Sequence, residues 1–125
     1  MRHVVILALT GILMGSLSAF VGLPSVVEFS AWIVAYLLWI VYAVRVQLER
    51  PVRRLVAAST LAGLFTGSIQ VLFMEQYKVS NPWYAEFFNS SASQLATQFL
   101  GFGIGRGVVF GLIVGLAVRW RLARD

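Results

Sequence analysis

The stretch LATQFLGFGIGRGVVFGLIVGLAV, residues 95–118, decides the fold of this chain. Arg106 is its only charged residue, and an apolar helix needs about 20 residues to cross the hydrocarbon core of a bilayer. Arg119 and Arg121 follow directly, as basic residues do at the cytoplasmic end of a membrane helix. The stretch therefore predicts a transmembrane helix.

Three further apolar runs of similar length precede this stretch. They cover about residues 4–21, 26–46 and 54–74. Pro51 separates the second run from the third, because proline is tolerated in the first turn of a helix and not in its interior. A cleaved signal peptide is the alternative for the first run, but Gly11 and Gly15 favour a packed helix there.

The composition points to a lipid environment. Hydrophobic residues make up 59% of the chain and charged residues only 12%, whereas soluble domains average about half and a quarter. A water-soluble domain of 125 residues exposes too much surface to hide four long apolar runs. We therefore predict an all-α integral membrane protein, with residues 1–125 forming a single domain of four transmembrane helices in an up-down bundle.

The basic residues predict the orientation of these spans. Eight of the ten lie near the chain ends or in the turn between the second and third runs: Arg2, Arg45, Arg50, Arg53, Arg54, Arg119, Arg121 and Arg124. By the positive-inside rule, both termini and this turn are expected in the cytoplasm of a bacterial cytoplasmic membrane. Because the charges sit in short turns and not on a solvated face, the net charge of +5 predicts no nucleic-acid partner.

A polar and aromatic segment lies between the third and fourth runs. Asn81 and Pro82 are typical of a helix cap and first residue. The aromatic residues that follow recur at helical spacing: Trp83, Tyr84, Phe87 and Phe88. We predict a short interfacial helix over about residues 81–89, lying in the headgroup region on the outer side.

Glycines spaced four residues apart mark three of the runs. They are Gly11 and Gly15, Gly63 and Gly67, and Gly103, Gly107, Gly111 and Gly115. In lipid, helices associate through close backbone contact, which glycine permits. Contacts within one chain are the favoured interpretation, although three such faces keep contact with another chain open.

Arg106 is the candidate functional residue, because a charge inside a membrane span is costly and needs a partner. Glu75 is its expected partner, with Glu28 and Gln70 as alternatives. A structural ion pair, or an anchor on a lipid phosphate, is favoured over an anion site, a lipid-headgroup site or a pore.

Reactive residues are scarce. The chain has no cysteine, its only aspartate is Asp125, and no paired carboxylates or activated nucleophile can be assembled within the spans. We predict no catalytic site, no metal site and no cofactor, whereas a bound lipid is compatible with the sequence. The stripe Trp32, Tyr36, Trp39 and Tyr42 is expected to fill space between helices in preference to binding a pigment or quinone.

Three functions are compatible with these features. The leading hypothesis is a non-enzymatic accessory or assembly subunit that binds other membrane subunits, or itself, through glycine-rich faces. The alternative is a small transporter or channel that uses Arg106 to engage an anionic solute. The third is a protein that binds membrane lipid or a hydrophobic cofactor.

Overall fold

The computed structural model describes residues 1–125 as an all-helical chain without strands. Its elements are α1 (Arg2–Ser16), the π-helical turn η1 (Leu17–Val21), α2 (Ser25–Arg45), α3 (Pro51–Leu72), α4 (Met74–Ser80), the 3₁₀ helix η2 (Pro82–Asn89) and α5 (Ala92–Leu122). Four helices, with α1 and η1 counted as one, are long and apolar enough to cross a membrane. The prediction of an all-α chain with four candidate spans is therefore confirmed, and the fold is compatible with an integral membrane protein.

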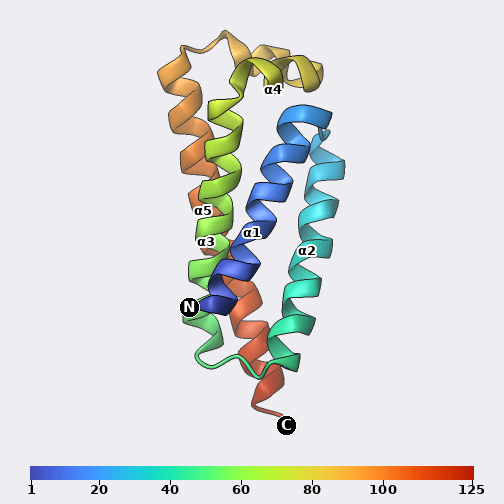
Figure 1. Cartoon of the computed structure of the whole chain (residues 1–125), viewed down its shortest axis with the longest axis vertical. Coiled ribbons are helices and arrows are strands. Elements are labelled where there is room, and N and C mark those ends of the chain that lie inside the picture. Colours follow the sequence, from blue (N-terminus) through green and yellow to red (C-terminus); the bar gives the residue numbers. More distant parts are fainter.

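The central helix of the bundle is α3. It packs along α5 on one side and α1 on the other, and none of its residues from 58 to 71 is exposed. Helix α2 contacts α5 less extensively. Both termini and the α2–α3 turn lie at one end of the long helices, and α4 and η2 lie at the other (Figure 1). We call these the terminal end and the α4 end.

Glycine allows the close approach of α1, α3 and α5. Each of the eight packing glycines faces the backbone of a neighbouring helix, so that an added Cβ would meet it. The contacts are Gly11 with Ala62, Gly15 with Thr66, Gly63 with Gly103, Gly67 with Phe99, Gly107 with Ser59, Gly111 with Val56 and Gly115 with Val52. The glycine faces are therefore occupied within the chain. At Gly101 and Gly105, by contrast, an added Cβ would have no neighbour within 4 Å.

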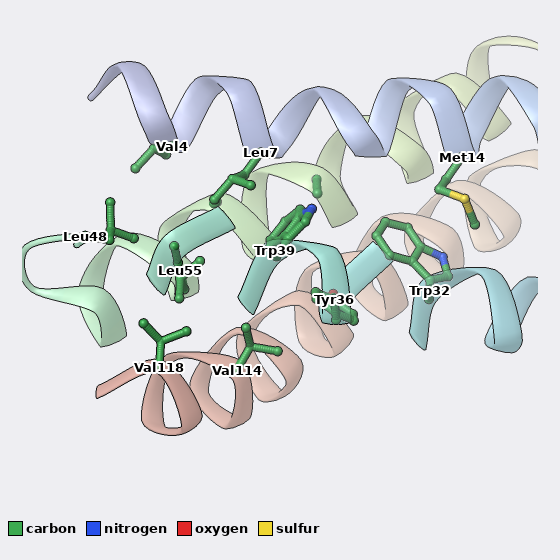
Figure 2. Close-up of a cluster of buried hydrophobic side chains, with 13 residues drawn as sticks. Val4, Leu7, Met14, Trp32, Tyr36, Trp39, Leu48, Leu55, Val114 and Val118 are labelled. Atoms are coloured by element: carbon green, nitrogen blue, oxygen red, sulfur yellow. The ribbon is translucent and has the colours of Figure 1, made fainter. Parts of the chain in front are cut away.

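Helix α2 turns its aromatic stripe into the core. Trp32, Tyr36 and Trp39 are buried, and Figure 2 shows their rings between α1 and α5. The Tyr36 hydroxyl lies 2.7 Å from Ser59 Oγ on α3. The Trp39 indole N–H donates to Thr10 Oγ1 on α1 at 3.2 Å. These rings fill the space between helices. The two hydrogen bonds satisfy the Tyr36 hydroxyl and the Trp39 indole N–H, to which the apolar part of a lipid could offer no hydrogen bond.

The third long helix ends earlier than the predicted boundary at residue 74. Phe73 has non-helical dihedral angles (φ −111°, ψ 38°), so α3 stops at Leu72 and α4 starts in a new direction. Helix α4 then lies across η1, at the end of the first long helix (Figure 1).

Asn81 connects α4 to the turn between α1 and α2. The sequence predicts that its side chain caps the next helix, but it makes no cap hydrogen bond there. Instead it is fully buried: Oδ1 accepts from the Leu23 N–H at 3.1 Å, and Nδ2 donates to the Ser18 and Tyr77 carbonyls at 2.7 and 2.8 Å. Backbone groups near the end of the first long helix lack partners within a helix. The Asn81 side chain bonds to them, and it is therefore not available to cap η2.

The segment after Asn81 is the 3₁₀ helix η2, within which Tyr84 departs from helical geometry (φ −103°, ψ 17°). The predicted aromatic face assumes 3.6 residues per turn, whereas a 3₁₀ helix has three. The aromatic residues consequently do not share one face. Trp83 and Phe87 are exposed, while Tyr84 and Phe88 are partly buried.

Candidate functional site

Arg106 forms an ion pair with Glu28 of α2. Its Nη1 lies 3.8 Å from Glu28 Oε1, and the two side chains are only 14% and 17% exposed. The Arg106 guanidinium also stacks over the Trp32 ring, with Cζ 4.5 Å from the ring centroid, and lies 5.5 Å from the Phe102 ring. A cation between aromatic faces and a carboxylate is stabilised where lipid would not solvate it.

The expected pairing of Arg106 with Glu75 is wrong. Glu75 instead accepts a hydrogen bond from Lys78 at 3.2 Å, and its side chain is 91% exposed. The break at Phe73 is the physical reason, because it places Glu75 on α4 and away from the end of α3. Glu28, the alternative partner, is the only acidic residue in the second run.

The ion pair lies close to one end of α2. This helix has 21 residues and is therefore about 31 Å long, which matches the hydrocarbon thickness of a bilayer. Glu28 comes three residues after Ser25, the first residue of α2, so it lies about 4.5 Å from that end. Helix α5 has 31 residues, about 46 Å, and its polar first turns extend beyond this level.

A recess of about 460 Å³ lies between the ion pair and the α4 end. Its surface is mostly apolar, and we call it the polar recess for the polar side chains that it contains. Its polar lining comes from α3, α4, η2 and α5: Thr66, Gln70, Tyr77, Tyr84 and Gln98. Phe88 and Phe99 add aromatic walls. Burial raises the pKa of the Tyr77 phenol, so that this side chain stays neutral and can donate a hydrogen bond.

A second recess of about 730 Å³ lies between α2 and α5, and we call it the apolar groove. Val26, Phe29, Val109 and Phe110 form most of its apolar lining. The first three of these side chains are more than half exposed, so the groove lies on the apolar surface of the bundle. Polar recess and apolar groove share four residues: Glu28, Tyr84, Phe102 and Arg106.

The charged pair retains hydrogen-bonding capacity. The Arg106 guanidinium, with its five N–H groups, has no hydrogen-bond acceptor in the chain within bonding distance. The Glu28 carboxylate lies near the buried Trp32 indole N–H, which has no other acceptor. No three His, Cys, Asp or Glu side chains lie together in a group that could hold a metal ion. The site's chemistry is therefore that of one cation and one anion beside aromatic rings.

The structure brings only some of the predicted residues to this site. Arg106, Tyr84, Phe87 and Phe88 line the polar recess, whereas Trp83 does not. Sequence reasoning missed several lining residues: Tyr77, Gln98, Phe99 and Phe102. Phe102 lies one helical turn before Arg106 and Gln98 two turns before it, and this i, i+4, i+8 spacing on one helix face was the available signal. Comparison with protein-family models, with curated proteins and with solved structures finds no match.

Proposed function

We propose that this chain is a non-enzymatic membrane protein that binds a membrane lipid between α2 and α5. The observation that carries the proposal is the position of the Arg106–Glu28 pair, which borders both the polar recess and the apolar groove. Both recesses are mostly apolar, so the pair is a charged site within apolar surroundings, and a lipid likewise joins a charged headgroup to apolar chains. Sites for small ligands combine an apolar lining with a few placed polar groups, as here.

We further propose that the four long helices form an up-down bundle across a bacterial cytoplasmic membrane, with both termini in the cytoplasm. The clustering of basic residues at the terminal end supports this orientation. The α4 end then faces outward, and the exposed Trp83 and Phe87 of η2 suit the headgroup region as interfacial anchors.

The other two functions have less support from the geometry. The accessory-subunit hypothesis assumed that the glycine faces bind another chain. These faces contact neighbouring helices of the same chain, so a partner would have to bind a different surface. For an anion transporter, Glu28 neutralises the positive charge of Arg106 and would repel the solute. Lipid binding uses both charges and the apolar groove together.

Photo-crosslinking in liposomes tests the proposal. A phospholipid with a diazirine in its acyl chain would be reconstituted with the protein, irradiated, and its adducts mapped by peptide mass spectrometry. We expect labelling concentrated on Val26, Phe29 and Val109, in excess over Leu9 and Leu13 of α1, which are similarly apolar and exposed. Equal labelling of α1 and the apolar groove would show that lipid contacts the chain only as solvent.

A further inference from the structure

We infer that the lipid has a zwitterionic headgroup with a primary ammonium, as in phosphatidylethanolamine, and that Arg106 holds its phosphate while Glu28 holds its ammonium. This inference rests on the proposed function and specifies its ligand. The observation behind it is the juxtaposition of a cation and an anion, 3.8 Å apart and without a hydrogen bond between them, at the junction of the polar recess and the apolar groove.

Charge favours a zwitterion over a purely anionic lipid. Arg106 and Glu28 together carry no net charge. A headgroup with a phosphate alone would be attracted by Arg106 and repelled by Glu28 at a similar distance, in surroundings of low dielectric constant where both effects are large. A headgroup that carries both charges engages both side chains favourably.

Hydrogen bonding favours the same ligand. The Arg106 guanidinium can donate in a forked geometry to two oxygens, which suits a phosphate. The Glu28 carboxylate accepts hydrogen bonds only, so it suits a group with several N–H donors such as a primary ammonium. At 3.8 Å the two side chains are in electrostatic contact without a hydrogen bond between them. The Arg106 donors, and the Glu28 lone pairs that do not face the Trp32 indole, are therefore left for a ligand.

The aromatic surroundings discriminate against choline. A trimethylated ammonium cannot donate a hydrogen bond to Glu28, and proteins recognise it through the faces of aromatic rings. Here the Arg106 guanidinium already lies over the Trp32 ring and beside the Phe102 ring. The protein's own cation thus already occupies a face of the Trp32 ring, where a choline group would bind.

The depth of the site suits a headgroup. Glu28 lies about one helical turn from the end of α2, at the boundary between the hydrocarbon core and the headgroup layer. From this level the apolar groove extends along α5 to Val109 and Phe110, one turn further into the bundle. The acyl chains would follow this groove, and the polar recess on the other side of the pair accommodates the headgroup.

Native mass spectrometry tests the inference. The detergent-purified protein would be incubated with an equimolar mixture of phosphatidylethanolamine, phosphatidylcholine and phosphatidylglycerol. We expect phosphatidylethanolamine adducts in about tenfold excess over each of the others, the ratio expected for one additional hydrogen bond to a charged group. Glu28→Gln should shift the preference toward phosphatidylglycerol, because it removes the repulsion of an anionic headgroup while leaving Arg106.

The variant Glu28→Gln/Arg106→Gln removes both charges without leaving either unpaired, so it keeps the test interpretable if a single variant does not fold. Glu75→Gln and Arg53→Gln, on exposed positions outside both recesses, are the matched controls and should retain the wild-type ratio. The double variant should bind the three lipids equally. Equal binding of the three lipids by the wild type, or a preference for phosphatidylglycerol, would refute the zwitterion assignment while leaving lipid binding intact. No adduct with any lipid would remove the proposed function as well.

Discussion

Replacing Gly103 with alanine should destabilise the bundle, whereas the same change two residues later should not. A Cβ on Gly103 would meet the carbonyl oxygen of Gly63, which belongs to the backbone of α3 and cannot rotate away. A Cβ on Gly105 would have no neighbour within 4 Å. Gly101→Ala, which is equally unobstructed, provides a second control on the same helix.

The size of the expected loss of stability follows from comparing the three variants with one another. All three positions lie inside α5, so the gain of up to about 1 kcal/mol in helix propensity from glycine to alanine is common to them and cancels in the comparison. The remaining difference is the cost of overpacking against α3. Inserting a methyl group into a packed interior costs about 1–3 kcal/mol, and a fixed backbone neighbour at Gly63 favours the upper part of that range.

Reversible unfolding in mixed micelles would measure this difference. Gly103→Ala is expected to lower the free energy of unfolding by about 2–3 kcal/mol relative to Gly105→Ala, with Gly101→Ala grouping with Gly105→Ala. Equal stability of all three variants would mean that α3 and α5 are not in backbone contact at Gly63 and Gly103. The central position of α3 would then be wrong.

Three further predictions address other parts of the chain. Asn81→Ala removes three hydrogen bonds and should lower the free energy of unfolding by about 2–4 kcal/mol in the same assay, while Asn89→Ala on the exposed surface should change it little. Glu28→Gln and Arg106→Gln should each lower the free energy of unfolding by about 3 kcal/mol, because each leaves a largely buried charge without its partner. The double variant should lose less than the sum of the two, and strict additivity would show that the pair does not interact. In intact cells an impermeant maleimide should label Asn89→Cys but reach Glu49→Cys only after permeabilisation, and the chain has no cysteine to interfere; the reverse pattern would invert the orientation.

The four long helices could be predicted because local composition determines them. A run of about 20 apolar residues specifies a span without reference to the rest of the chain. The glycine spacing likewise identified residues that now lie between α1, α3 and α5, although the sequence could not say which helices meet. That choice depends on the arrangement of all four helices at once.

The site was harder to predict because it depends on contacts between distant segments. Arg106 stood out from its own neighbours, but its pairing with Glu28 requires α2 and α5 to be adjacent near the α4 end. The predicted pairing of Arg106 with Glu75 is wrong because one non-helical residue, Phe73, redirects the chain after α3 and carries Glu75 away from α5. The 3₁₀ geometry of η2 likewise turns Tyr84 into the polar recess in a way that helical spacing does not indicate.

The most direct test of lipid binding at Arg106 is the distance between its guanidinium and lipid phosphorus, measured by solid-state NMR dipolar recoupling in phosphatidylethanolamine bilayers. The loss of one arginine signal in Arg106→Gln would assign the resonance. We predict that lipid phosphorus dephases this signal as strongly as that of the exposed Arg119, at the distance of a hydrogen-bonded guanidinium–phosphate pair. An Arg106 signal that remains unaffected while that of Arg119 is dephased would contradict the account.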